Sequence, residues 1–321
     1  MHGGTVLAIK VPAGAGTRAT CADPLHAGAQ PLSMIPTHHP FEFKTSDGLT
    51  LHGMVYGEGY PELVFAHGNG LAAECYAPAF APLASIARVY GLNARGHGGS
   101  DVPPDFPSWR HSMEDLRDFI VQHLHPPVVL VAHSFGANLS LWLTAEHPEL
   151  VRGMVLMDPI IPFRRFEPWP EGAYAEHLHQ IALKRRSKWP SRAAAEESLK
   201  GRGGYQGWDE EAWQQFLDAC FVFNEFAEFV LACPPWLEAA IFKTRPAGIT
   251  WQWAEQCHVP AVVLGGEASP VTSAECFQDL ADALPQGRFV QLPGGHTFPQ
   301  EHPAETGRAL FEAVSGMLEP A

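Results

Sequence analysis

The chain has 321 residues, 46% of them hydrophobic, which is enough for one large domain with an inserted subdomain. Its net charge of −14 argues against a nucleic-acid partner, because phosphate binding needs a basic face. No apolar run approaches the ~20 residues of a membrane span, and the N-terminus lacks the apolar segment of a signal peptide. Six scattered cysteines without a Cys-x-x-Cys pair are typical of reduced thiols. We therefore expect a soluble, cytoplasmic protein.

The chain changes character near residue 41. Residues 1–40 are rich in Gly, Ala, Pro and His without periodicity, so we expect an irregular N-terminal arm. Residues 41–45 and 49–56 then flank Ser46-Asp47-Gly48, a strand–turn–strand pattern. Short apolar runs follow, each with a helix-like stretch near it. The apolar runs are residues 63–66, 88–92, 128–132, 154–157, 261–264 and 289–292, and the helix-like stretches lie near residues 71–86, 112–124, 135–147, 273–284 and 303–317.

This alternation predicts an α/β fold. Uninterrupted apolar strands between amphipathic helices are typical of a parallel sheet covered on both faces, here of about eight strands. The alternation fails over residues 161–253, which hold seven of the nine tryptophans and resemble short helices broken by Pro and Gly. We predict that this insertion is a helical cap over the strand ends, where ligands bind in open α/β sheets. Residues 41–160 and 254–321 would form the core.

A serine stands where a predicted strand meets a helix. Residues 128–132 run into Ala132-His133-Ser134-Phe135-Gly136, and a helix-like stretch follows at once. A serine at such a sharp turn needs small residues two positions away on either side, and Ala132 and Gly136 meet that need. The turn projects the hydroxyl above the sheet at a helix N-terminus, where the dipole favours developing negative charge. An N-cap serine would not need these small neighbours, so we predict Ser134 as a nucleophile.

A nucleophilic serine needs a base, and position selects one of seventeen histidines. His296 follows a Pro-Gly-Gly loop between the last predicted strand and the final helix, so it returns over the sheet edge to the serine. His67 and His97 lie in glycine-rich loops after earlier strands, where we expect structural roles. His133 points away from the serine by strand alternation. The sequence therefore predicts a Ser134–His296 pair.

Four segments, in this order and spacing, resemble the α/β-hydrolase superfamily over residues 41–318. They are His67-Gly68-Asn69-Gly70, Arg95-Gly96-His97-Gly98-Gly99-Ser100-Asp101, Ala132–Gly136 and Gly295-His296. The resemblance implies an oxyanion hole formed by the backbone N–H groups of Phe135 and Asn69, each worth ~10²–10³ in rate. We expect no cofactor, because acyl transfer by a serine needs none.

The acid of the triad departs from the superfamily pattern. The resemblance places it after the strand that follows the insertion, where this chain has Ser269. Asp158 ends the strand that follows the predicted helix over residues 135–147, on the active-site side of the sheet. Glu267 lies two residues from Ser269. We favour Asp158, with Glu267 as the alternative, and both keep the order Ser…acid…His. Residues 184–195 and 231–240 are similar to a lipase-like branch of peroxisomal lipases and fungal toxin-pathway hydrolases, which supports Asp158.

These residues predict two-step acyl transfer. Ser134 attacks a carbonyl as His296 takes its proton, and the same histidine then activates the water that releases the acid. We expect a carboxylic-ester hydrolase (esterase, lipase or lactonase) for a small apolar acyl or aromatic ester, because the insertion is rich in aromatic residues. The alternatives are a C–C bond hydrolase or another non-ester enzyme of the same fold, such as a haloperoxidase-like enzyme, and a non-catalytic ligand receptor. Dehalogenases and epoxide hydrolases of this fold also resemble the chain, but they carry aspartate at the position of Ser134, the strand-to-helix turn called the nucleophile elbow.

Two further patterns give weaker evidence of a function. His177-Leu-His179 and His123-Leu-His125 come without a His-Glu-x-x-His motif or further ligands, so we expect no metal site. The basic residues among 184–188 stand out in an acidic chain, and we expect them to form a solvated helix face.

Overall fold

The computed structural model describes residues 35–161, 173–246 and 249–318. Most of the predicted N-terminal arm lies outside these residues, as does Cys21. The first strand, β1 (His38–Lys44), begins inside the predicted arm and pairs antiparallel with β2 (Thr50–Tyr56). Gly48 turns the chain between them with a φ of 92°, a left-handed conformation that glycine adopts without strain. The predicted strand–turn–strand is confirmed.

Eight strands form one sheet, in the order β1-β2-β4-β3-β5-β6-β10-β11. The strands after β2 are β3 (Glu62–Ala66), β4 (Arg88–Leu92), β5 (Val128–His133), β6 (Val151–Met157), β10 (Ala261–Gly266) and β11 (Gly287–Leu292). Every neighbouring pair from β4 to β11 is parallel, whereas β1–β2 and β2–β4 are antiparallel. The predicted α/β fold with a mostly parallel sheet is confirmed.

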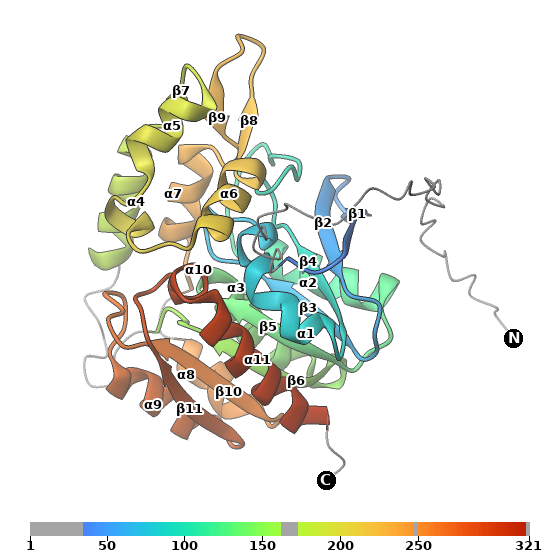
Figure 1. The fold of residues 1–321 in the computed structure, drawn as a ribbon. Coiled ribbons are helices and arrows are strands. Elements are labelled where there is room, and N and C mark those ends of the chain that lie inside the picture. The colour runs from blue at the N-terminus through green and yellow to red at the C-terminus, as the bar shows by residue number, and fades with distance from the viewer. Residues whose placement is uncertain (1–34, 162–172, 247–248, 319–321) are drawn as a thin grey trace, which may run out of the picture. The chain divides into compact units, whose positions relative to one another are not determined.

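Helices cover both faces of the sheet, which explains why its central strands are apolar throughout. Along β5, Val128, Leu130 and Ala132 belong to one buried cluster, and Val129 and Val131 belong to the other. The first cluster includes α2 (Arg110–His123), α3 (Phe135–Glu146), α8 (Thr250–Gln256) and α9 (Ala274–Ala283). The second includes the 3₁₀-helix η1 (Ala73–Phe80), α1 (Ala81–Ala84) and α11 (Pro303–Leu318), which Figure 1 shows in cyan and red. Two short helices, η2 (Pro148–Leu150) and α10 (Phe298–Glu301), precede β6 and α11.

The predicted helix over residues 71–86 differs from the observed structure. The segment forms the 3₁₀-helix η1 followed by the single turn α1, rather than one α-helix. Pro78 lies inside η1 and Pro82 lies in the first turn of α1. Proline lacks the N–H that an α-helix needs at an interior position, so two prolines four residues apart favour short, tight turns.

The insertion between β6 and β10 contains both helices and strands (Figure 1). Besides α8, its helices among the described residues are α4 (Ala173–Lys184), α5 (Arg192–Leu199), η4 (Gly203–Tyr205), α6 (Glu210–Ala219) and α7 (Pro235–Lys243). Its strands β7 (Lys188–Trp189), β8 (Phe221–Phe223) and β9 (Phe229–Leu231) form an antiparallel sheet in the order β7-β9-β8. The sequence predicted helices alone, because strands of two or three residues are too short to show alternation.

The insertion packs directly on the core. Helix α6 contacts η1, and its Trp213 and Phe216 join the buried cluster on that face of the sheet. Helix α8 spans the predicted end of the cap at residue 253, and Trp253 stacks on Trp142 of α3 at 4.9 Å. Residues 162–172, which the prediction also assigned to the cap, lie outside the described residues. The cap boundaries stay a prediction.

In the described part of the chain, no helix has the length and apolar character to cross a membrane. The described cysteines are buried and form no disulfide, namely Cys75, Cys220, Cys233, Cys257 and Cys276. Burial raises the pKa of the Cys257 and Cys276 thiols to about 12, because a thiolate is poorly solvated there.

Candidate active site

Ser134 lies at the turn between β5 and α3 in an unusual backbone conformation. Its φ is 52°, and its N–H donates to the carbonyl of Met157 on the next strand at 2.9 Å. Such left-handed backbone at a non-glycine residue costs roughly 1–3 kcal/mol and clusters at functional sites. A Cβ on Gly136 would lie 2.2 Å from the carbonyl oxygen of Ala66, so only glycine fits at this position. The need for small neighbours at this turn is therefore steric.

Three predicted site residues form one hydrogen-bonded chain. His296, in the loop between β11 and α10, has its Nε2 atom 3.0 Å from Ser134 Oγ. Its Nδ1 atom lies 2.6 Å from Oδ1 of Asp158, the residue that follows β6. Because a carboxylate oxygen only accepts, Nδ1 carries the proton and Nε2 is left to accept from the hydroxyl. Asp158 is fully buried, and Ser134 is 4% exposed. This arrangement suits proton transfer from the serine.

Asp158, rather than the alternative acid Glu267, contacts the histidine. Ser269 Oγ donates to Asp158 Oδ1 at 2.9 Å, and the Gly266 N–H donates to Oδ2 at 3.1 Å. With His296 Nδ1, the carboxylate therefore accepts three hydrogen bonds. Glu267 is exposed, and no described residue hydrogen-bonds its carboxylate. Ser269, at the position where the superfamily pattern expects an acid, thus donates to the carboxylate that contacts His296.

The peptide group between Gly68 and Asn69 is fixed through its carbonyl. The Gly68 carbonyl accepts from His67 Nδ1 at 2.8 Å and from the Leu71 N–H at 3.2 Å. Because the peptide is planar and trans, the Asn69 N–H points the opposite way. The Gly70 N–H, by contrast, donates to a ring nitrogen. The Asn69 N–H has no acceptor among the described residues, as an oxyanion donor requires.

The second predicted oxyanion donor, the Phe135 N–H, lies at the first turn of α3. The Ser134 carbonyl accepts from the Asn138 N–H at 3.2 Å, which directs the carbonyl along the helix and the Phe135 N–H out of its N-terminus. This N–H has no acceptor within the described ranges. The Gly136 N–H donates to the His67 carbonyl at 3.1 Å, so the loop at residues 67–71 is tied to the serine turn.

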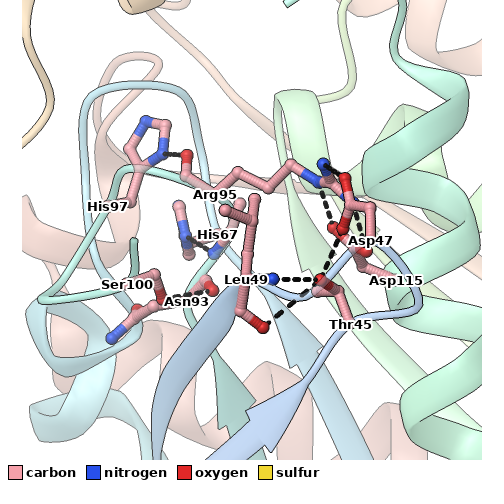
Figure 2. A network of polar contacts seen from close by, with 10 residues as sticks. Thr45, Asp47, Leu49, His67, Asn93, Arg95, His97, Ser100 and Asp115 are labelled. Atoms are coloured by element: carbon pink, nitrogen blue, oxygen red, sulfur yellow. Dashed lines mark hydrogen bonds and ion pairs between the residues drawn. The ribbon is translucent and has the colours of Figure 1, made fainter. Parts of the chain in front are cut away.

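His67 and His97 support this loop as neutral rings. His67 Nε2 accepts from the Ala94 N–H at 2.9 Å, and His97 Nε2 accepts from the Gly70 N–H at 3.1 Å. His97 Nδ1 donates to the Arg95 carbonyl at 2.9 Å (Figure 2). Burial lowers the pKa of His67 to about 3 and that of His97 to about 4. The structural roles expected for both histidines agree with these contacts.

Figure 2 shows the ion-pair network beside these histidines. Arg95 contacts Asp115 at 2.6 and 2.7 Å, and Asp47 at 2.6 and 3.1 Å. Arg95 and Asp115 are each 5% exposed, so both charges depend on this pairing. The hydrogen bonds from Arg95 lower the pKa of Asp47 to about 2. Ser100 Oγ donates to the Asn93 carbonyl at 2.9 Å and closes the turn. The motif at residues 95–101 is therefore a scaffold for the loop.

Acid is expected to destabilise the protein through His67 and His97. Both pKa values are lowered in the folded state, whereas the unfolded chain takes up a proton on each ring near pH 6.5. Between about pH 6.5 and pH 4, each histidine should therefore lower the free energy of unfolding by about 1.4 kcal/mol per pH unit. Above this range both rings are neutral in both states and add no pH dependence. Urea titrations across this range measure the slope.

The matched variant for this prediction is His97→Gln, because a glutamine amide can still accept from the Gly70 N–H. The slope should fall by about 1.4 kcal/mol per pH unit, since one titrating group is removed. A slope equal to that of the wild type would contradict the assignment of a lowered pKa to His97.

The insertion places a partly buried ion pair on the predicted oxyanion loop, which sequence reasoning missed. Arg185 Nη1 contacts Glu238 Oε2 at 2.7 Å, and its other terminal nitrogen contacts the Tyr205 hydroxyl. A Cβ on Gly70 would lie 3.2 Å from Glu238 Oε1 and 3.4 Å from Arg185 Nη1. Asn69 Nδ2 also donates to the Glu238 carbonyl at 3.0 Å. The expected solvated face is therefore wrong for Arg185, whose side chain is 21% exposed and pairs with Glu238. Sequence reasoning missed this pair because Glu238 lies far away in the sequence.

A mainly apolar cavity lies beside the two predicted oxyanion donors. Its volume is about 310 Å³, including the space at its open mouth. Core and insertion both line it, with Asn69, Trp109, Phe135, Ile160, Ala175, Leu178, Ile241, Phe242 and Arg245. Trp109 Nε1 donates to the Ile241 carbonyl at 2.7 Å, which joins the two parts at the cavity wall. Within the described ranges, no group of three His, Cys, Asp or Glu residues could hold a metal ion.

Comparisons with known proteins agree with the fold of this chain. A model of the alpha/beta hydrolase family matches residues 63–309. The chain is 26% identical over 286 residues to a fluoroacetate dehalogenase from Burkholderia sp., covering 83% of this chain and 91% of that protein. It is 28% identical over 269 residues to a pimeloyl-[acyl-carrier protein] methyl ester esterase from Chromobacterium violaceum, covering 80% and 94%. The solved structure of an E-2-(acetamidomethylene)succinate hydrolase superposes with a TM-score of 0.74 at 21% identity, covering 86% and 100%.

Proposed function

Because the chain belongs to the alpha/beta hydrolase family, we propose that it is a serine hydrolase that cleaves a carboxylic ester through an acyl-enzyme. The hydrogen-bonded chain from Ser134 through His296 to Asp158 carries this proposal, with contacts of 3.0 and 2.6 Å. A serine with a base, and a base held by a buried carboxylate, is the arrangement that acyl transfer needs.

Each residue has one role in the proposed mechanism. Ser134 attacks the ester carbonyl while His296 Nε2 takes its proton, and Asp158 stabilises the imidazolium that forms. The N–H groups of Asn69 and Phe135 hold the negative oxygen of the tetrahedral intermediate. His296 then protonates the leaving alcohol and activates the water that releases the acid. The chemistry needs no cofactor.

The cavity beside the predicted oxyanion donors supports an apolar acyl or aromatic substrate. It is lined mainly by aliphatic and aromatic side chains, and its space of about 310 Å³, which already includes the open mouth, is an upper bound on the acyl group that it can hold. An acyl group bound there would have its carbonyl next to Asn69 and Phe135. We therefore favour an esterase for short to medium acyl groups over a lipase for long chains. The five buried cysteines of the described residues form no disulfide, which supports a reducing, cytoplasmic location.

The relatives are named for the cleavage of more than one kind of bond. One relative is a methyl ester esterase, which favours an ester, and another is a fluoroacetate dehalogenase. Ser134 stands at the elbow, where the superfamily resemblance gives dehalogenases an aspartate, so we do not extend dehalogenation to this chain. A C–C bond hydrolase would use the same three residues on a β-diketone, and substrate turnover separates it from an esterase.

Turnover of p-nitrophenyl esters should depend on acyl length. Each methylene buried in the cavity contributes about 0.8 kcal/mol, so kcat/KM should rise about fourfold per methylene from acetate onwards. Once the cavity is full, longer chains gain nothing, and palmitate should be a poor substrate. A steady-state series from acetate to palmitate, with a β-diketone in parallel, measures this profile. Turnover of the diketone without any ester would contradict the proposal.

A further inference from the structure

Three hydrogen bonds join the predicted oxyanion loop to the loop that carries His296. The Gly68 N–H donates to Tyr76 Oη at 3.1 Å. Tyr76 Oη lies 2.7 Å from Nδ1 of His133, the residue directly before Ser134. His133 Nε2 lies 2.8 Å from the carbonyl oxygen of His296. We call Tyr76 and His133 the buried bridge, because together they connect Gly68 with His296.

The direction of every hydrogen bond in the bridge follows from its ends. The His296 carbonyl can only accept, so His133 Nε2 carries a proton. Burial and the neighbouring His296 lower the pKa of His133 well below its usual value, so the ring is neutral and Nδ1 accepts. Tyr76 therefore donates to Nδ1, which leaves a lone pair of its oxygen to accept from Gly68. All donors point one way, and each partner is satisfied.

The bridge is also confined sterically. Tyr76 is fully buried, and His133 is 1% exposed. A Cβ on Gly68 would lie 2.8 Å from His133 Nδ1 and 3.3 Å from Tyr76 Oη, so glycine is needed for the loop to approach this closely. The His133 and His296 rings lie 4.8 Å apart between centroids. The bridge therefore leaves little freedom for either loop to shift.

We propose that Tyr76 and His133 are positioning residues that hold the Asn69 N–H and His296 Nε2 at the relative position that the reaction needs. This inference rests on the proposed serine hydrolase function. The Asn69 N–H follows Gly68 in the chain, and it must meet the oxygen of the same intermediate whose proton transfers pass through His296. A misplacement of 1 Å between such groups can lower the rate by about 10²-fold. The loss falls on kcat, because substrate binding in the apolar cavity does not involve the bridge.

Tyr76→Phe tests the bridge with a small change. Phenylalanine keeps the ring and its packing on Phe65, whose centroid lies 4.5 Å away, but removes the hydroxyl. The Gly68 N–H and His133 Nδ1 then both lose their partner in a buried place. We expect kcat for the best p-nitrophenyl ester to fall by about 10- to 100-fold with KM within about twofold of the wild type. A folded variant with wild-type kcat would overturn the proposal.

Two substitutions of His133 separate the ends of the bridge. In His133→Gln, the amide nitrogen can replace Nε2 and still donate to the His296 carbonyl. In His133→Asn, the shorter side chain can replace Nδ1 as an acceptor for Tyr76 but cannot reach His296. We expect His133→Gln to retain several-fold more kcat than His133→Asn. Equal losses in the two variants would contradict a role through the His296 loop.

Thr144→Val is the matched control for lost stability. Thr144 is fully buried on α3, and its hydroxyl donates to the Ser140 carbonyl at 2.7 Å, away from the bridge. This variant should lose stability without losing kcat, and an equal loss of kcat would assign the bridge effect to stability alone.

The bridge also has a signature that does not depend on turnover. The His133 Nε2 proton should exchange slowly with solvent in the wild type and much faster in Tyr76→Phe, as histidine-selective NMR measures. If the wild type exchanges slowly but hydrolyses no ester, the proposed function fails while the bridge stands. If the proton exchanges equally fast in both proteins, the bridge fails whatever the activity.

Discussion

Replacing Ser134 by alanine is expected to lower kcat for ester hydrolysis by about six orders of magnitude, as for the nucleophile of other triads. The reason is the loss of the only oxygen that lies 3.0 Å from His296 Nε2 among the described residues. The residual rate should come from the oxyanion donors and from substrate binding, which the substitution leaves intact. KM should change little, because Ser134 takes part in bond formation more than in binding.

Ser140→Ala is the matched control for this variant. Ser140 is a buried serine on α3, and its hydroxyl has no hydrogen-bond partner in the described part of the chain. Its removal should leave kcat within about twofold, because surface or core changes away from the reacting groups act on stability. Retained ester turnover in Ser134→Ala, measured on protein free of contaminating esterase, would remove Ser134 from the mechanism.

Asp158→Asn is expected to lower kcat by about 10⁴-fold, while Glu267→Gln should leave it within about twofold. An asparagine has no negative charge to stabilise the imidazolium of His296. Its NH₂ group would also face either His296 Nδ1 or the Gly266 N–H, both of which are donors in the native structure. One orientation forces the wrong tautomer on His296, and the other buries two donors against each other.

Steady-state kinetics of the two acid variants at one pH provide the comparison. Glu267→Gln is the isosteric control, because Glu267 is exposed and its carboxylate lacks a described partner. A larger loss in Glu267→Gln than in Asp158→Asn would move the acid to Glu267. Equal and small losses in both would leave His296 without a carboxylate partner in the mechanism.

The sheet was predictable because both of its faces are buried. Runs such as residues 128–132 and 261–264 are apolar at every position, which occurs in parallel strands covered by helices. The short strands β7, β8 and β9 gave no such signal, since two or three residues cannot establish a period. The 3₁₀-helix η1 has a helix-like composition, and sequence periodicity did not distinguish it from an α-helix.

The proximity of Ser134, His296 and Asp158 was predictable from their places after strands of one parallel sheet. The carboxyl ends of such strands meet at one edge, so residues far apart in sequence come together there. Alternation also predicted that the His133 ring faces away from the serine. It gave no hint of the contact between His133 and the His296 carbonyl, because that contact depends on the path of a loop 163 residues further along the chain.

The contacts of Ser269 and Arg185 depend on tertiary packing in the same way. Ser269 marked a departure from the superfamily pattern, but its hydrogen bond to Asp158 requires the exact meeting of two loops. Arg185 belongs to a run of basic residues that resembles a solvated face, and its burial depends on Glu238 of α7. The desolvation cost of a charge inside a protein is offset only when a partner of opposite charge is present, and one sequence does not reveal that partner.

Labelling with a fluorophosphonate tests the central claim most directly, because the reagent traps a serine that is activated by a neighbouring base. The wild type and Ser134→Ala would be treated in parallel, and the modified peptide identified by mass spectrometry. We predict stoichiometric labelling of the peptide that contains Ser134 in the wild type and none in the variant. A folded wild type that stays unlabelled, or that is labelled at another residue, would contradict the assignment of Ser134 as the nucleophile.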